Sequence, residues 1–360
     1  MLVAGLSACG GHERHDEALG APLAAGPLDR PELVVFRSVD RLVRMYADGS
    51  GARVLVGKSA GRGPHAAFFG GASWSPDGKQ IAFTADLGDL QRLSYRPDIF
   101  VMSADGSQRR RLTTSADSFG PVWSPDGQRI YFARRPDSHP EQIRLSDGRV
   151  EPPMWISSIR PDGTDQRDLT SPVAGRFEFP GAFSPDGAWL AFTRGRYVDL
   201  TSRGRAPNTS DVWLIRPDGT EPHKLAARAQ DPAFSPEGRR IAFASDRDQN
   251  GSLNYGDRAF FANELYVMHA DGSRARRVTR TRALNELGPA WMPSGAQIAY
   301  QRGKQYQNAE TMKVFRANAD GSCPRIVAAS AGPDAWPWYA APAWRPGDAR
   351  KGDGRLTCKG

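Results

Sequence analysis

Short runs of apolar and β-branched residues alternate along the chain with tight turn sequences. Residues 122–132, VWSPDGQRIYF, are typical, because an apolar pair precedes Ser-Pro-Asp-Gly and a second run with alternating apolar positions follows. Proline presets the φ angle of the second turn position, aspartate suits the third, and glycine accepts the left-handed conformation that leads into the next strand. The stretch therefore predicts a β-hairpin.

A second turn-centred pattern alternates with the first. In FVMSADGSQRRRLT, for example, a β-rich run leads into Asp-Gly and another run follows. The Ser-Pro-Asp-Gly module begins at Ser73, Val122, Ala182, Ala233, Ala290 and Ala343. The Asp-Gly module begins at Arg44, Phe100, Ser157, Trp213, Tyr266 and Phe315. Two hairpins in succession give a unit of four antiparallel strands.

The spacing of these units indicates one repeated architecture. Successive prolines of the first module, from Pro76 to Pro293, lie 49 to 60 residues apart, which is typical of propeller blades. Packing around an axis buries both apolar faces of each blade. Residues 32–56 lack the first module, and residues 341–348, APAWRPGD, supply it. The pattern predicts an all-β, six-bladed β-propeller of four-stranded antiparallel blades over residues 32–360, closed by pairing of the N- and C-terminal segments in one blade.

One unit carries a more specific likeness. Residues 241–279 contain IAFASDRDQNG, ELYVMHADGS and RRVT. These segments resemble the WD-like repeats of the TolB family of β-propellers, and the resemblance extends over about residues 32–346. It implies the fold and says much less about activity, because the same repeat serves in scaffolds, in accessory domains of peptidases and in a few lyases. TolB proper carries an α/β domain ahead of its propeller, whereas we expect a lone propeller here.

The N-terminus contains a candidate lipidation site. Residues 6–9, Leu-Ser-Ala-Cys, resemble the lipobox of bacterial lipoproteins, in which the cysteine is lipidated. The basic segment and longer apolar stretch that precede such a site are missing, so either the true start lies upstream or the match is accidental. We expect a truncated signal remnant at residues 1–8, lipidation at Cys9 and a flexible tether at residues 9–31. The protein would then lie in the periplasm or cell envelope, attached to a membrane only through its lipid anchor.

Composition and charge narrow the choice of partners. The 360 residues carry a formal charge of +8, but the basic residues are scattered and no nucleic-acid-binding motif is present. We therefore expect no nucleic-acid partner. No apolar run approaches the roughly 18 residues that can span a membrane. If the chain is exported, Cys323 and Cys358 could form a disulfide, and two unrelated free thiols are the alternative.

The long non-repeated segments predict a functional face. The connections between the second and third strands are long in five blades, at residues 84–98, 133–153, 193–211, 244–263 and 301–310. All five belong to one side of a propeller, which we call the long-loop face, and insertions gathered on one face usually mark a binding side. The approaches to the first strands carry a candidate acidic rim for a cation or basic peptide, Asp117, Glu178, Asp231 and Glu286. Ordinary solvated carboxylates are the alternative.

Two further groups could bind a ligand on that face. A candidate basic collar for an anionic ligand follows the second strands, Arg37, Arg134, Arg194 and Arg302. A genome-wide bias toward arginine would produce the same pattern without a site. Trp336 and Trp338 break the repeat and could stack on a sugar or a peptide side chain, or be buried in the closing blade.

Residues 246–257, DRDQNGSLNYGD, match the spacing of an EF-hand calcium loop. Asp246, Asp248, Asn250 and Asp257 occupy four of its ligand positions, and such a loop converges hard oxygen atoms on Ca²⁺. The last of these positions is usually glutamate and no flanking helices are expected, so chance overlap with the repeat is the alternative. No cofactor other than calcium is expected.

Several common catalytic motifs do not occur in the sequence. There is no H-E-x-x-H, Cys-x-x-Cys or glycine-rich phosphate loop, and no histidines stand at metal-ligand spacing. The leading hypothesis is a non-enzymatic scaffold, monomeric, that docks an envelope protein or peptide on the long-loop face. The alternative hypothesis is a hydrolase or lyase that acts on a polysaccharide or peptide at the mouth of the propeller channel.

Overall fold

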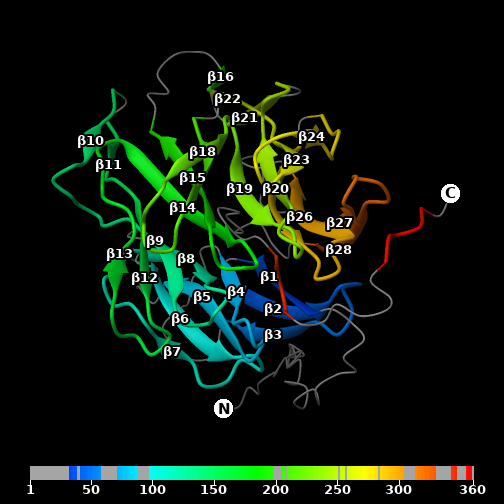
Figure 1. Ribbon diagram of the computed structural model, residues 1–360, viewed down its shortest axis with the longest axis horizontal. Coiled ribbons are helices and arrows are strands. Elements are labelled where there is room, and N and C mark those ends of the chain that lie inside the picture. Colours follow the sequence, from blue (N-terminus) through cyan, green and yellow to red (C-terminus); the bar gives the residue numbers. More distant parts are fainter. Residues whose placement is uncertain are drawn as a thin grey trace, which may run out of the picture.

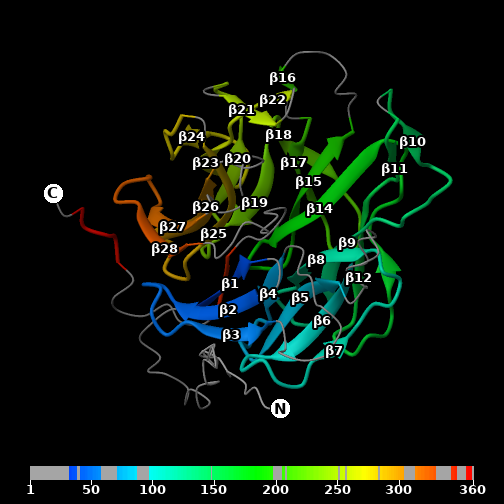
Figure 2. The ribbon, with the colours of Figure 1, turned by 180° about the vertical axis from the view of Figure 1, so that it is seen from behind.

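The chain folds into six four-stranded antiparallel sheets arranged as a ring (Figures 1 and 2). The computed structural model describes residues 32–38, 41–57, 71–86, 97–146, 148–197, 205–206, 209–249, 252–255, 258–282, 284–303, 313–329, 342–346 and 354–358. Their regular elements are all strands, and within these ranges there is no helix of the length and apolarity that crossing a membrane requires. The prediction of an all-β, six-bladed propeller is confirmed.

The strands of the first three blades run in order from the innermost to the outermost. Blade 1 consists of β29 (Ala343–Trp344), β1 (Glu32–Ser38), β2 (Arg41–Tyr46) and β3 (Arg53–Val56). Blade 2 consists of β4 (Ala72–Trp74), β5 (Gln80–Asp86), β6 (Pro97–Ser103) and β7 (Arg110–Arg111). Blade 3 consists of β8 (Ser118–Trp123), β9 (Ile130–Arg134), β12 (Trp155–Ile159) and β13 (Arg167–Asp168).

The other three blades follow the same order. Blade 4 consists of β14 (Arg176–Phe183), β15 (Leu190–Arg196), β17 (Asp211–Ile215) and β18 (His223–Ala226). Blade 5 consists of β19 (Gln230–Phe234), β20 (Arg240–Ser245), β23 (Glu264–His269) and β24 (Arg276–Arg277). Blade 6 consists of β25 (Asn285–Trp291), β26 (Gln297–Gly303), β27 (Lys313–Asn318) and β28 (Arg325–Ala329).

The core lies between blades rather than within a single sheet. Because successive strand residues point to opposite faces, Ile81 and Phe83 pack toward blade 1, whereas Ala82 between them packs toward blade 3. A cluster of buried apolar side chains fills each of the six junctions between neighbouring blades. The ring therefore buries apolar surface that an isolated blade would expose to water.

Blade 1 closes the ring with strands from distant parts of the sequence. β29 pairs antiparallel with β1, and the innermost strands contact one another in the order β29, β4, β8, β14, β19, β25 and back to β29. The Trp344 indole donates to the Ala290 carbonyl of blade 6 at 3.2 Å, and the Arg345 guanidinium lies 3.1 Å from the Glu32 carboxylate. The predicted closure by N- and C-terminal segments in one blade is confirmed.

The glycines of the Asp-Gly turns lie where neighbouring blades touch. All six have φ between 83° and 89°, a left-handed conformation that residues with a Cβ adopt at a cost. Each faces a carbonyl oxygen at or just after the outermost strand of the preceding blade. The pairs are Gly49 with Val327, Gly106 with Leu55, Gly163 with Leu112, Gly219 with Leu169, Gly272 with Leu225 and Gly321 with Val278. The repeated turn thus sets the spacing between blades as well as the hairpin.

The long-loop face carries strands outside the blades. β10 (Ile143–Arg144) and β11 (Val150–Glu151) form a hairpin in the loop of blade 3. β16 (Arg205–Ala206), from the loop of blade 4, pairs in parallel with β22 (Arg258–Phe261) of blade 5, and β21 (Ser252–Tyr255) completes the sheet. Both views show these three strands together at the edge of the ring (Figures 1 and 2). The loops of blades 4 and 5 are therefore joined through their backbones.

Candidate functional site

A central channel runs between the innermost strands of the blades. Its cavity measures about 740 Å³ and reaches the long-loop face at Tyr197, Phe261 and Asn263. This volume lies within the roughly 300–1,000 Å³ that is usual for ligand sites. Aromatic side chains occupy the equivalent position of all six blades around it, Trp74, Trp123, Phe183, Phe234, Trp291 and Trp344.

Three of these tryptophans connect neighbouring blades. Each indole N–H donates to a carbonyl on the innermost strand of the preceding blade. The pairs are Trp74 with Ala343, Trp291 with Ala233 and Trp344 with Ala290, at 3.1 to 3.2 Å. Buried indole groups usually have such a partner, so these three tryptophans connect the blades as well as lining the channel.

The candidate acidic rim and the candidate basic collar are partners of each other. The pairs are Asp117 with Arg134 at 2.8 Å, Glu178 with Arg194 at 2.6 Å, and Glu286 with Arg302 at 2.8 Å. The cross-strand register places Glu178 opposite Arg194 and Glu286 opposite Arg302. All three carboxylates are buried, where an unpaired charge would be costly. Each of these three carboxylates is therefore paired with an arginine of its own blade.

Each of the three arginines also covers an aromatic ring on the third strand of its blade. The distances from guanidinium carbon to ring centroid are 5.1 Å for Arg134 over Trp155, 4.3 Å for Arg194 over Trp213, and 4.6 Å for Arg302 over Phe315. A planar guanidinium can stack on a ring while its edge donates to a carboxylate. The two contacts together hold the collar arginines against their blades.

Glu286 titrates differently from an ordinary glutamate. Burial raises the pKa of Glu286 to about 7, and the charge of Glu264 adds to the rise, although Thr281 and Arg302 oppose it. Its Oε2 atom is buried and accepts no hydrogen bond from the residues that the structure describes. Near pH 7 the negative charge of this buried pair is therefore only partly present.

The described part of the candidate calcium loop is bound to arginines. Asp246 is buried and lies 3.0 Å from Arg228, and Asp248 pairs with Arg277. Asn250 and Asp257 lie outside the described residues. Among the residues that are described, no group of three or more histidine, cysteine or acidic side chains is arranged to hold a metal ion. Calcium binding stays a prediction from the sequence.

Several other predicted site residues fall outside the part of the chain that can be described. These are Cys9, Trp336 and Trp338, together with the side chain of Arg37. Lipidation and stacking at these positions stay predictions.

Asp231 differs from the other rim carboxylates because it has no cationic partner among the described residues. It lines the channel at a β-bulge of β19, with φ of 54°. Three other blades place glycine there, Gly71, Gly120 and Gly288, also at positive φ. Facing the channel, Asp231 is partly accessible, yet protein atoms surround it. This burial raises the pKa of Asp231 to about 6, although the Gly288 N–H opposes the rise by donating to its Oδ2 at 3.1 Å.

The Asp231→Asn substitution is expected to raise the free energy of unfolding by about 2 kcal/mol at pH 7.5. The folded state holds the Asp231 proton up to about pH 6, whereas an unfolded aspartate loses it near pH 3.8. Stability therefore falls as the pH rises through this window, and asparagine removes that loss. Urea denaturation should show the gain at pH 7.5 and no gain below about pH 4.

Asp186 provides a control in which the same substitution should change stability in the opposite direction. The Ser184 hydroxyl lowers the pKa of this turn aspartate, so its charged form stabilises the fold at neutral pH. Asp186→Asn should consequently lower stability at pH 7.5. Equal effects of the two substitutions would show that charge burial at Asp231 is not the cause.

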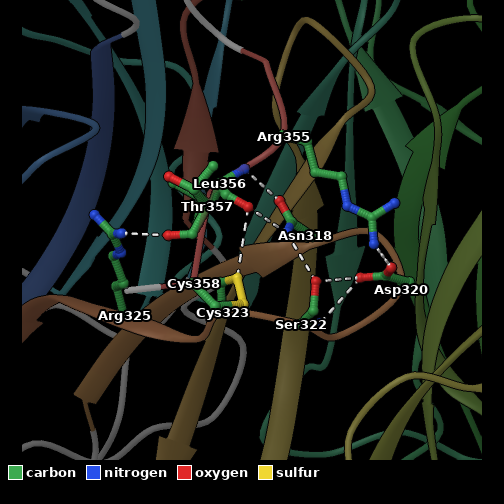
Figure 3. Close-up of a disulfide and its surroundings, with 9 residues drawn as sticks. All are labelled: Asn318, Asp320, Ser322, Cys323, Arg325, Arg355, Leu356, Thr357 and Cys358. Atoms are coloured by element: carbon green, nitrogen blue, oxygen red, sulfur yellow. Dashed lines mark hydrogen bonds and ion pairs between the residues drawn. A yellow bond between two sulfur atoms is a disulfide. The ribbon is translucent and has the colours of Figure 1, made fainter. Parts of the chain in front are cut away.

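A disulfide attaches a C-terminal segment to blade 6 (Figure 3). Cys323, in the turn between β27 and β28, is bonded to Cys358, with 4.9 Å between their Cα atoms. Backbone groups of Leu356 exchange hydrogen bonds with the Asn318 side chain at 2.6 and 2.9 Å, and Arg355 pairs with Asp320. The segment therefore lies along this turn through side-chain and covalent contacts.

The comparisons with known proteins agree with the geometry of the ring. No protein-family model matches the sequence. A dipeptidyl-peptidase 5 from Porphyromonas endodontalis is 30% identical over 144 residues, which are 40% of this chain and 18% of that protein. The Tol-Pal system protein TolB from Anaeromyxobacter dehalogenans is 31% identical over 138 residues, 38% of this chain and 26% of that protein. The chain thus matches about a fifth to a quarter of the length of these relatives.

Similarity of fold extends further than similarity of sequence. The crystal structure of TolB from Acinetobacter baumannii superposes with a TM-score of 0.60 at 16% identity, covering 89% of this chain and 68% of that one. At this identity the likeness concerns the fold alone. Together with the six blades and their repeats, it shows that the chain is a TolB-like six-bladed β-propeller.

Proposed function

We propose that this protein is a non-enzymatic scaffold of the cell envelope that docks a protein or peptide on its long-loop face. The observation that carries the proposal is the pairing of three rim carboxylates with collar arginines. Asp117, Glu178 and Glu286, which could have served in chemistry, are each bound to an arginine of their own blade. Much of the channel wall is backbone, proline and aromatic surface, which suits packing against a partner.

The relatives support a protein partner in the envelope. One of them is named as the TolB protein of the Tol-Pal system, and a TolB structure shares the fold. An extracytoplasmic location is also compatible with the bond between Cys323 and Cys358. Attachment through a lipid at Cys9 is a further part of the proposal and depends on the lipobox-like residues 6–9.

A second candidate function is cleavage of a peptide or polysaccharide at the channel mouth. It is favoured by the 30% identity with a dipeptidyl-peptidase 5. The two proposals differ in the fate of a bound partner, because a scaffold releases it intact and a hydrolase or lyase does not. Binding and integrity of the partner therefore have to be measured together.

Photo-crosslinking from the two faces tests the docking proposal. A benzophenone amino acid replaces Glu141, exposed in the long loop of blade 3, or Asp162, exposed in the short turn on the opposite face. The folded protein is illuminated with a periplasmic and membrane extract of the source cells, and adducts are identified by mass spectrometry. We expect the same discrete adducts in repeated preparations from position 141 and none of them from position 162.

Two results would contradict the proposal. Identical adducts from both positions would show that capture is independent of the long-loop face. Truncated adducts, or cleavage of the captured partner when it is incubated with the purified protein, would favour the hydrolase or lyase. Intact adducts confined to position 141 would support the scaffold.

A further inference from the structure

Asp231 lies beside a backbone N–H of a β-bulge that requires a hydrogen-bond acceptor. At the equivalent bulge of blade 3, the Gly120 N–H donates to the Thr84 hydroxyl of blade 2 at 2.9 Å. The N–H of Asp231 itself donates in the same way to Thr193 of blade 4 at 3.0 Å. A bulge N–H on one blade is therefore satisfied by a threonine on the second strand of the preceding blade.

In blade 5 the acceptor for this N–H is a carboxylate instead of a threonine hydroxyl. Ala244 occupies the position that Thr84 and Thr193 hold in blades 2 and 4, so it offers no hydroxyl to the bulge of blade 6. The Gly288 N–H of that bulge donates to Asp231 Oδ2 instead, at 3.1 Å. A threonine would have satisfied the same N–H without placing an ionisable group in the channel.

The second carboxylate oxygen of Asp231 is available to a ligand. Oδ1 accepts no hydrogen bond from the residues that the structure describes, and no arginine or lysine among them pairs with the carboxylate, in contrast to Asp117, Glu178 and Glu286. Asp231 also occupies a left-handed conformation at φ of 54°, where aspartate is less favourable than glycine. The channel therefore contains a carboxylate that its own blades leave unneutralised.

We infer that Asp231 binds a lysine or arginine side chain that a docked peptide or protein inserts into the channel from the long-loop face. The inference rests on the proposed docking function and adds the chemistry of the inserted group. A lone carboxylate complements one monovalent cation. The aromatic and proline walls, including Phe179 and Trp291, can cover the methylene stem of such a side chain.

The test compares peptide pools that differ at one position. Capped, fluorescein-labelled nonapeptides with randomised flanks carry lysine, arginine, Nε-acetyl-lysine or norleucine at the centre, and binding to the full chain is measured by fluorescence anisotropy at pH 7.5. We expect the lysine and arginine pools to bind roughly ten- to a hundredfold more tightly than the two uncharged pools. Acetyl-lysine is the closest control, because it retains the stem and removes the charge.

Two variants separate binding from folding. Asp231→Asn keeps the shape of the side chain and should abolish the preference for lysine and arginine. The double variant Asp231→Gly with Ala244→Thr restores the arrangement of blades 2 and 3, a glycine bulge facing a threonine hydroxyl. It should fold with a melting temperature at least equal to that of the unmodified protein and bind all four pools equally. Loss of preference in this stable variant cannot be ascribed to unfolding.

The outcomes distinguish this inference from the proposed function. Binding without preference between lysine and acetyl-lysine, or a preference that persists in Asp231→Asn, overturns the inference and leaves docking in place. Failure of every pool to bind overturns both. Binding of n-butylammonium as tight as that of the lysine pool would assign the site to a free small cation and would also overturn the inference.

Discussion

Reduction of the Cys323–Cys358 disulfide is expected to lower the free energy of unfolding by roughly 3 to 4 kcal/mol. The bond joins residues separated by 35 positions, and a loop of this size restricts the unfolded chain by about that amount in a chain-entropy treatment. The enclosed segment contains β28 and the closing strand β29. Urea denaturation followed by tryptophan fluorescence, with and without a phosphine reductant, measures the difference.

The control for this prediction is a variant with both cysteines replaced by serine. It should have the stability of the reduced protein and should not respond to the reductant. Unchanged stability on reduction of the unmodified protein would mean that the hydrogen bonds of Leu356 and the Arg355–Asp320 pair retain the segment without the covalent link.

The Gly321→Ala substitution is expected to cost roughly 2 to 4 kcal/mol of folding free energy. Gly321 has φ of 87°, so alanine meets the steric penalty of the left-handed conformation. A Cβ there would also overlap the carbonyl oxygen of Val278 in blade 5, which forces the two blades apart. Thermal and urea unfolding of the purified variant provide the measurement.

Gly148 supplies a matched control for the conformational part of this effect. Its φ is 84°, but apart from its own chain neighbours no atom of the described residues lies within 4 Å of the position that a Cβ would take. Gly148→Ala should therefore cost only about 1 kcal/mol. If the two alanine variants lose the same stability, contact between the Asp-Gly turn and the preceding blade does not contribute.

Most of the ring could be predicted because each blade repeats the same turn motifs and the same pattern of apolar residues. Ser-Pro-Asp-Gly and Asp-Gly specify the hairpins, alternating apolar residues specify two buried faces, and the missing hairpin strand of blade 1 indicates how the ring closes. The sheet of β16, β21 and β22 was not predicted. It forms between two non-repeated loops, so no periodicity in either loop indicates the pairing.

The acidic rim and the basic collar were predicted as two separate sites, although three residues of one pair with three residues of the other. The repeat pattern places the acidic residues at equivalent positions of the blades, and likewise the arginines. It does not by itself show which residues face each other across a hairpin. Glu178 and Arg194 are 16 positions apart, as are Glu286 and Arg302. In a hairpin with a four-residue turn and one bulge, this separation brings them opposite each other. The pairing was thus contained in the sequence.

Asp231 was predicted as a member of the rim, but its special position was not. The sequence does contain a sign of this position. Residues 118–121 and 286–289 read SFGP and ELGP, whereas the equivalent residues 229–232 read AQDP, with aspartate in place of glycine. Neither the bulge nor the absence of a neighbouring cation among the described residues follows from that exchange. Both depend on how adjacent blades meet, and no local pattern specifies that contact.

The completion of blade 1 by β29 also sets an order of events during folding. The hairpins of blades 2 to 6 form between nearby residues, whereas Glu32 and Arg345, which meet in blade 1, are 313 positions apart. Such distant contacts have to overcome the entropy of closing a long loop before they stabilise anything, so they form late. Until then the strand edges at the seam remain open to other chains. The rate of closure, more than the stability of the finished ring, therefore determines how long this protein is exposed to aggregation.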